Sequence, residues 1–385
     1  MAGLSKRMWR RTNRTDGLPG PGMGRRTDPA GAARSAAPRI SVIMAAFNAA
    51  PFLAAAIDSL LAQTFPDFEL IVIDNGSTDV TAAILGSYTD PRITVLRPGR
   101  NLGVVGARNL GFTSARGQYL AVHDADDISL PVRFARQVEY LDSHPDCVLV
   151  SSDIFRLHAS GTLTRTDYRG AASPLLLDWM LFLGNPIAFS STMMRTSALR
   201  ALPEFLRQER CYAEDMDLYV RIRLQGFLAR LTTPLLMYRV HPGGASVRHR
   251  QEMVSQTRSI LLEQWGVKAS DDEFLPQESY ATAASVLAGG EDLLDADAFG
   301  RLRAALLRLQ TEFLARLPDG SEPEIGAVQR YTGKVWEQIV CRTLYEQGMD
   351  ALWWKAFAWP ASRPGGATGR RVVALLRGMF KRLRR

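Results

Sequence analysis

The sequence predicts an α/β fold in which a mainly parallel sheet is flanked by helices, and three observations carry this prediction. Between residues 40 and 123, short apolar runs alternate with helical segments of about ten residues, which is the pattern of βαβ units. The apolar runs are continuous, as expected of strands covered on both faces. Polar residues cluster directly after these runs, where ligands bind in such sheets.

The predicted elements alternate regularly along this part of the chain. Each predicted strand is a short run dominated by Ile, Val, Leu or Ala, and each predicted helix has the apolar spacing of a helix packed on one side. The strands are Ile40–Ala46, Glu69–Asp74, the run that follows the Asp90 turn as far as Leu96, and Gln118–His123, and the helices are Phe52–Leu61, Thr78–Tyr88 and Gly103–Ala115.

Composition divides the chain into four parts. Residues 1–38 are rich in Gly, Pro, Arg and Ala without apolar periodicity, which predicts a disordered basic arm. Residues 39–250 form the predicted α/β domain, and residues 251–350 a helical accessory region. Residues 351–385 form a basic tail that ends in a short amphipathic helix. The predicted helices of the accessory region are Glu252–Trp265, Asp297–Leu317 and Ala327–Gly348.

The net charge of +8 is unevenly distributed. Residues 1–39 hold nine Lys/Arg and two acids, residues 351–385 hold nine Lys/Arg and no acid, and residues 40–350 therefore carry −8. Because nucleic-acid binders usually present a basic face, an acidic body predicts no nucleic-acid partner. The basic ends instead predict contact with an anionic membrane surface. The alternatives are a solvated basic arm and a tail that is solvated or packed on the body.

The cysteines and the hydropathy pattern indicate the compartment. Cys147, Cys211 and Cys341 are scattered and form no C-x-x-C pair, so neither a disulfide framework nor a zinc site is predicted. No apolar run of signal-peptide length follows the basic N-terminus. No uncharged apolar stretch of about 18 residues occurs; the nearest, Pro174–Phe189, contains one Asp and one Asn. We expect a cytoplasmic protein, peripheral at the cytoplasmic face of the membrane.

Two carboxylates, Asp124 and Asp126, follow the fourth predicted strand at D-x-D spacing. Carboxylates placed in this way can face one divalent cation, and oxygen ligands suit Mg²⁺ or Mn²⁺, which can also hold a diphosphate. The alternative is that they only cap a turn or a helix start. Asp127 beside them and Pro131 at the start of the next helix favour the metal site.

Three other polar clusters are candidates for chemistry. In the turn Asp74–Asp79, a carboxylate or amide can bind a base edge or a ribose hydroxyl, or the turn only caps the next helix. Asp215 lies at a helix start, as a general base or as an acid stabilised by the helix dipole. His241 precedes a Gly-rich loop, as a ligand or as a structural histidine.

Together these strings resemble the nucleotide-binding half of the inverting family-2 glycosyltransferases, which have the Rossmann-like GT-A fold. The resemblance is close over residues 39–145 and thinner as far as residue 245. The matching strings are Ser41-Val-Ile-Met-Ala-Ala-Phe-Asn48, Gln63-Thr-Phe-Pro-Asp-Phe-Glu-Leu-Ile-Val-Ile-Asp74-Asn-Gly-Ser-Thr-Asp79, Asn101-Leu-Gly103 with Arg108-Asn109, Ala115-Arg-Gly-Gln-Tyr-Leu-Ala-Val-His-Asp124-Ala-Asp126-Asp127, Glu214-Asp215 and Tyr238-Arg-Val-His241.

The resemblance implies a donor site for a nucleotide-diphosphate sugar, with a UDP-sugar favoured. Asp126 would contact the metal on the diphosphate, and Asp124 would hold the ribose or share the metal. His241 is a weaker candidate for contact with the metal or phosphate. The implied cofactor is Mg²⁺ or Mn²⁺.

The resemblance also assigns the nucleoside and the catalytic base. Asp74 and Asn75 would lie at the base, with the backbone around Ala45 and Phe47 lining the same pocket. Arg108 would contact the diphosphate or nucleoside. The position of Asp215 matches the catalytic base, which would take the proton of an acceptor hydroxyl while the donor's anomeric carbon is attacked with inversion. The acceptor would be a glycan or a lipid-linked saccharide.

Several departures from the family pattern bear on these expectations. The usual Pro and Tyr of the first string are Ala45 and Phe47 here, and the second carboxylate of the base-binding turn is Asn75. The Q-x-x-R-W motif of processive synthases is missing, which favours single-sugar transfer. A catalytically silent membrane-docking or scaffold protein and a sugar nucleotidyltransferase are the alternatives. A dehydrogenase or P-loop protein is disfavoured because neither glycine motif occurs.

Overall fold

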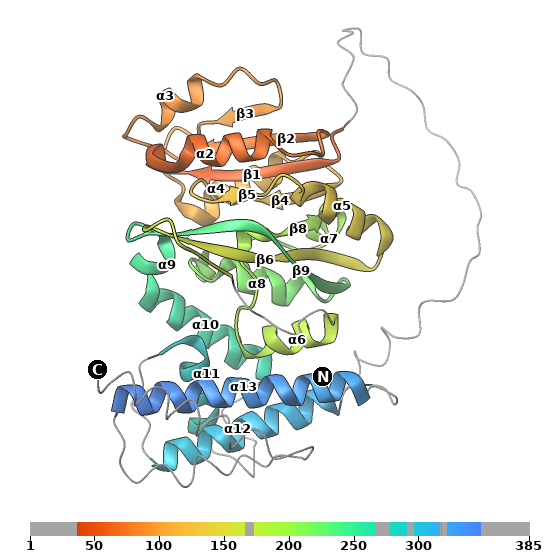
Figure 1. Cartoon of the computed structure of the whole chain (residues 1–385), viewed down its shortest axis with the longest axis vertical. Coiled ribbons are helices and arrows are strands. Elements are labelled where there is room, and N and C mark those ends of the chain that lie inside the picture. The colour runs from red at the N-terminus through yellow and green to blue at the C-terminus, as the bar shows by residue number, and fades with distance from the viewer. Residues whose placement is uncertain are drawn as a thin grey trace, which may run out of the picture.

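The computed structural model describes residues 37–165, 173–266, 277–290, 296–315, 317 and 322–347 of the chain (Figure 1). The predicted basic arm lies outside the described residues except for Ala37 and Pro38, and the basic tail lies wholly outside them. The described residues form a nine-stranded mixed sheet with helices on both faces, which confirms the predicted fold class.

The four predicted strands are confirmed. They pair in parallel in the order β3-β2-β1-β4, and β1 runs beside β2 in register as far as the pair Ala46–Asp74. The turns that follow these two strands therefore begin side by side at one edge of the sheet. The strands are β1 (Ile40–Ala46), β2 (Phe68–Asp74), β3 (Ile93–Leu96) and β4 (Tyr119–Val122).

Side chains of β1 alternate between two cores, since successive strand residues point to opposite faces. Val42 and Met44 share a core with α2, whereas Ile43 packs in the core that contains α4. Gly111 allows α4 to lie close to the sheet, because a Cβ at this position would be 2.3 Å from Cγ2 of Ile43. The helices that follow the first three strands confirm the prediction: α2 (Ala50–Leu61), α3 (Thr81–Gly86) and α4 (Gly103–Ser114).

The second half of the sheet was not predicted from the sequence. It continues from β4 in the order β8-β6-β9-β5, with β7 paired to β6, and it contains antiparallel pairs as well as the parallel pair β6–β9. Pro234 lies within β9 at an irregularity in the register, where the missing N–H is tolerated. The strands are β5 (Ile128–Ser129), β6 (Cys147–His158), β7 (Leu163–Arg165), β8 (Met193–Arg195) and β9 (Phe227–Val240).

Helices fill the connections of this second half. The apolar stretch around residues 174–189 is helix α6 followed by a turn and a short 3₁₀-helix, and its aromatics and all its leucines except the partly buried Leu175 are buried. The elements are α5 (Arg133–Ser143), α6 (Pro174–Leu183), η1 (Phe189–Ser191), α7 (Thr196–Arg200), η2 (Gln208–Arg210), α8 (Glu214–Ile222) and α9 (Ala245–Arg248).

The three predicted accessory helices are confirmed as α10 (Arg250–Trp265), α12 (Ala296–Leu314) and α13 (Glu322–Gln347), and α11 (Gln277–Ala288) lies between them. Figure 1 shows α12 and α13 at the end of the molecule opposite β3. They share a separate core with α6, in which the Trp179 indole donates to Oγ1 of Thr332 at 3.1 Å. None of the helices in the described ranges is long and apolar enough to cross a membrane.

Candidate active site

The D-x-D loop leaves β4 beside helix α4. Asp124 Oδ1 accepts a hydrogen bond from Arg108 Nη2 at 2.7 Å, and its Oδ2 accepts one from the Ser190 hydroxyl at 2.7 Å. The Asp124 backbone N–H donates to the same hydroxyl oxygen at 3.1 Å. Both carboxylate oxygens are thus engaged, and Arg108 and Ser190 hold the pKa of Asp124 below its ordinary value despite burial.

Arg108 joins this loop to helix α8. Its Nη1 pairs with Glu214 Oε1, and its guanidinium lies over the Phe189 ring at 4.8 Å from the centroid. The side chain is only 12% exposed. Burial acts to lower the pKa of Arg108, but Asp124 and Glu214 outweigh it and raise the pKa above the ordinary value. The guanidinium is therefore a permanent cation between two carboxylates from distant segments.

Asp126, the second carboxylate of the D-x-D loop, faces His241. Its Oδ2 lies 3.0 Å from His241 Nε2, and the ring of His241 packs on Phe52 with 4.7 Å between centroids. Arg239 binds the same loop through two hydrogen bonds. Its Nε donates to the Asp126 carbonyl at 2.8 Å, and its backbone N–H donates to Asp127 Oδ1 at 2.9 Å. Burial and the charge of Asp124 raise the pKa of Asp126.

The donor set around Asp126 fits a divalent cation shared with a substrate. A carboxylate oxygen and an imidazole nitrogen 3.0 Å apart can bind one ion, and this pair suits Mn²⁺ better than Mg²⁺. Asp127 Oδ2 is buried and has no hydrogen-bond partner among the described residues. No group of three or more His, Cys, Asp and Glu side chains able to bind a metal occurs in the described ranges. Cations that act on diphosphates take their remaining ligands from the phosphates and water.

The turn after β2 lies beside the turn after β1. Asp74 is buried, with Oδ1 accepting from the Ser77 N–H at 3.1 Å and Oδ2 lying 3.5 Å from Arg97 Nε. Asn48, in the left-handed region at φ 50°, accepts from the Thr78 N–H at 2.8 Å. This link fixes the chain after β1, where Phe47 is 53% exposed, and Ala45 near the end of β1 is partly buried.

Asn75 serves the neighbouring helix. Its Oδ1 accepts from the Leu102 N–H at 2.8 Å, and its Nδ2 donates to Asn101 Oδ1 at 3.1 Å and to the Gly103 carbonyl at 3.2 Å. Gly103 has φ 71°, a conformation that favours glycine. The amide at position 75 therefore holds the start of α4, the helix that carries Arg108.

Asp215 lies in the first turn of α8, next to Glu214. Its Oδ2 accepts from Asn185 Nδ2 at 2.8 Å, and its Oδ1 accepts from the Met216 N–H at 2.7 Å. Burial, followed by the negative charge of Glu214, raises the pKa of Asp215 to about 6. A carboxylate with this pKa is ionised near neutral pH and can accept a proton.

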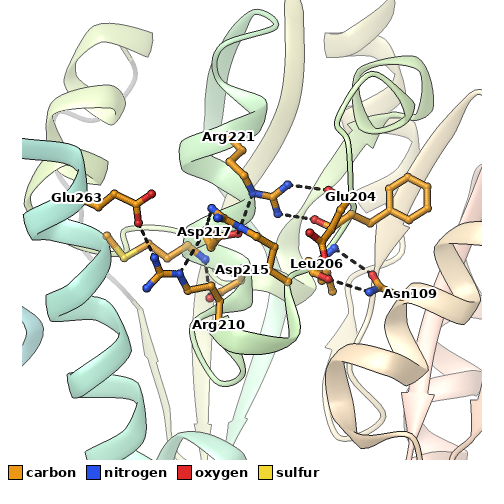
Figure 2. Close-up of polar contacts among 11 residues, drawn as sticks. Asn109, Glu204, Leu206, Arg210, Asp215, Asp217, Arg221 and Glu263 are labelled. Atoms are coloured by element: carbon orange, nitrogen blue, oxygen red, sulfur yellow. Dashed lines mark hydrogen bonds and ion pairs between the residues drawn. The ribbon is translucent and has the colours of Figure 1, made fainter. Parts of the chain in front are cut away.

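A network of arginines anchors α8 from the other side (Figure 2). Asp217 Oδ1 accepts from Arg207 Nη2 at 2.5 Å, and its Oδ2 accepts from Arg221 Nε at 2.8 Å. Arg210 lies 3.9 Å from Asp217 and also pairs with Glu263 of α10 at 2.5 Å. These contacts fix the helix whose first turn bears Asp215.

The structure thus brings together residues predicted from separate strings, but it adds partners that the sequence did not indicate. Asp124 and Asp126 lie on one loop, Arg108 links that loop to the helix of Asp215, and His241 meets Asp126. Ser190, Asn185 and Arg239 were missed as site residues. Asn185 lies in the turn before η1 and Ser190 lies in η1, and neither belongs to a motif. Arg239 could have been suspected because it lies two residues before His241.

Comparisons with known proteins identify the family of the chain. The family model described as glycosyl transferase family 2 matches residues 41–200. An uncharacterized glycosyltransferase of Haemophilus influenzae is 31% identical over 236 residues, which are 59% of this chain and 73% of that protein. The Escherichia coli protein WfaP, a UDP-Glc:α-D-GlcNAc-diphosphoundecaprenol β-1,3-glucosyltransferase, is 28% identical over 233 residues, which are 60% of this chain and 88% of its own length.

Solved structures agree in fold. S. aureus TarS 1–349 in complex with UDP aligns with a TM-score of 0.51 at 16% identity and covers 81% of this chain and 92% of that chain. A TarS structure with a longer chain is covered to 53% of its length, with a TM-score of 0.50. At this level of identity the likeness concerns the fold alone.

Replacing Arg108 by Ala is expected to lower the free energy of unfolding by about 3 kcal/mol, because the buried carboxylate of Glu214 and the partly buried one of Asp124 are left without a cation. Urea denaturation followed by circular dichroism measures this. The double variant R108A/E214Q should recover part of the loss. Arg136→Ala, which breaks an exposed pair with Glu139, should change stability by less than about 1 kcal/mol. Equal losses in R108A and the double variant would contradict the electrostatic explanation.

Proposed function

The chain belongs to glycosyltransferase family 2, and on that premise we propose that it transfers a single sugar from a nucleotide-diphosphate sugar to a hydroxyl group with inversion. One observation carries this proposal. The Arg108 guanidinium bonds both Asp124, on the D-x-D loop, and Glu214, the neighbour of Asp215. The groups that would bind a diphosphate and the group that would activate an acceptor therefore belong to one connected site.

The donor we propose is a UDP-sugar. The name of WfaP gives UDP-Glc as its donor, and WfaP is matched over most of its own length. Asp74 and the backbone around Ala45 and Phe47 would contact the nucleoside, because the turns after β1 and β2 are joined beside them. Asn75 would act on this pocket indirectly, through the start of α4 that it holds.

We propose that Asp126, with His241, would hold a divalent cation, Mn²⁺ or Mg²⁺, together with the donor's diphosphate. The bound cation would supply positive charge at the leaving diphosphate. Asp124 would lie beside the ribose or share the cation, in the position that Arg108 and Ser190 impose on it. Arg108 would act on the donor mainly by fixing Asp124, since both its terminal nitrogens already bind carboxylates.

Asp215 would act as the general base. Its carboxylate would take the proton from the acceptor hydroxyl while that oxygen bonds to the anomeric carbon and the bond to the nucleoside diphosphate breaks. A single displacement of this kind inverts the anomeric configuration. We propose a glycan or lipid-linked saccharide as acceptor, since the name of WfaP gives a diphosphoundecaprenol-linked sugar.

The decisive experiment measures the rate at which nucleoside diphosphate is released from each of a panel of nucleotide sugars in the presence of Mn²⁺ or Mg²⁺. Asp126→Asn and Asp215→Asn should each lower the rate by at least about 100-fold, because each removes a charge that acts in the transition state. Asp142→Asn, a change of the same kind at an exposed carboxylate that pairs with Arg39, is the control and should keep the wild-type rate.

Two outcomes would contradict the proposal. Full activity of purified D126N or D215N would refute the corresponding site assignment. Release of pyrophosphate when a nucleoside triphosphate and a sugar 1-phosphate are supplied, or the reverse reaction in which pyrophosphate converts a nucleotide sugar to nucleoside triphosphate and sugar 1-phosphate, would identify a sugar nucleotidyltransferase.

The rate should depend on pH through Asp215. Because a general base acts in its ionised form, kcat/KM should fall on the acid side with an apparent pKa of about 6, roughly tenfold for each further pH unit. The rate is therefore expected to be constant from about pH 7 upward until another group titrates. If kcat/KM instead falls at low pH with an apparent pKa of about 4, the ordinary value of an aspartate, another group limits the reaction.

We also propose that the basic tail places the enzyme at an anionic membrane surface, where lipid-linked acceptors are found. The proposal rests on the charge and apolar face of residues 370–385, which the structure does not describe. Full-length protein should sediment with liposomes containing anionic lipid, and a variant lacking residues 364–385 should not. Equal sedimentation of both would refute the role of the tail.

A further inference from the structure

The turn between α6 and η1 lies against the start of α8 and presents one side chain to Asp215. Asn185 Nδ2 donates to Asp215 Oδ2 at 2.8 Å. The same amide accepts from the Ile187 N–H through its Oδ1 at 3.2 Å, which fixes which end of the amide faces the carboxylate. Asn185 is exposed, so this contact is not required to fill the core.

The remaining oxygen of Asp215 has a donor of its own. Oδ1 accepts from the Met216 N–H at 2.7 Å, within the first turn of α8. Each carboxylate oxygen can accept a second hydrogen bond, so capacity to bind a proton remains on both. The two donors together determine the rotation of the carboxylate about its Cβ–Cγ bond.

The turn that carries Asn185 is itself held by buried contacts. Arg230, whose side chain is 1% exposed, donates through Nη1 to the Pro186 carbonyl at 2.9 Å and pairs with Asp153 at 3.6 Å. On the other side, Trp265 of α10 donates to the Phe182 carbonyl at the end of α6 at 2.9 Å. The position of Asn185 is thus set by β6, β9 and α10.

The charges that act on Asp215 come from two elements. Glu214 belongs to α8, as does Asp215, and Arg108 extends from α4 while also binding Asp124. The nearby Glu214 raises the pKa of Asp215, and the hydrogen bonds from Asn185 and Met216 lower it together with Arg108. Asn185 is the only one of these groups on the turn after α6.

We propose that Asn185 is a positioning residue of this active site, which holds Oδ2 of the base Asp215 in the orientation that meets the acceptor hydroxyl. This inference rests on the proposed function. Asn185 acts through Asp215 and takes no proton itself. Its loss should therefore reduce kcat and change the pH profile, without a large effect on KM for the donor.

The test compares Asn185→Asp, Asn185→Ala and the control Gln225→Glu, using the nucleotide sugar that gives the fastest diphosphate release. N185D keeps the acceptor for the Ile187 N–H but replaces the donated hydrogen bond by a like charge. We expect kcat to fall about tenfold or more and the acid-limb pKa to rise by roughly one unit or more. N185A should show a smaller rise in the same direction. Gln225→Glu adds the same charge at the opposite end of α8 and should behave as wild type.

The melting temperature of each variant is measured, and D215N is assayed in parallel. These measurements distinguish a wrong role for Asn185 from a wrong assignment of Asp215 as the base. If N185D and N185A keep the wild-type kcat and pH profile while D215N is inactive, the role of Asn185 is refuted and the proposed function stands. If D215N is fully active, the assignment of the base fails instead. If the rate falls with an unchanged pH profile and a lowered melting temperature, Asn185 only stabilises the turn and the inference is wrong.

Discussion

The geometry of the site depends on the guanidinium of Arg108, which lies between Asp124 and Glu214. Several carboxylates converge here from the D-x-D loop and the start of α8, and like charges in a partly dehydrated region repel one another. The N-terminus of α8 offsets some of this charge through its dipole. Among the residues that the structure describes, however, only Arg108 bonds to both segments, so it permits Asp215 and the D-x-D loop to share one site.

Helix α4, which carries Arg108, is itself held in place by contacts with several other segments. Asn75 holds the start of α4, and Gly111 allows the helix to lie close to the sheet. Within the helix, Asn109 is the residue after Arg108 and exchanges two hydrogen bonds with the backbone of Leu206. Arg108 and Asn109 thus reach both segments that flank the candidate base. Helix α10 supports the same region from the far side. Its Glu263 pairs with Arg210 (Figure 2), and its Trp265 donates to the Phe182 carbonyl of α6. Helix α10 therefore contributes to the shape of the candidate active site.

The sequence predicted the part of the candidate site that follows the parallel strands far better than the surroundings of Asp215. The four parallel strands follow from continuous apolar runs in βαβ units, and that order alone places Asp74 and Asp124 at the same sheet edge. The strands β6, β8 and β9 escaped prediction because their pairings join residues far apart in the chain, and a proline lies within β9. Asn185 and Ser190 carry no local signal, since their contacts depend on the path of an irregular segment.

This difference has a physical origin that bears on how such an enzyme changes its specificity. The groups proposed to meet the donor follow strands whose register is fixed by two buried faces, so a shift there would misplace a whole layer of the core. The groups around Asp215 instead lie on the turn after α6 and on the loop before α8, which are held by individual hydrogen bonds to Pro186 and Leu206. Loops held in this way can change without rebuilding the sheet. Under the proposed function, acceptor choice can therefore vary through these two segments while the proposed donor site and the Arg108 bridge stay the same.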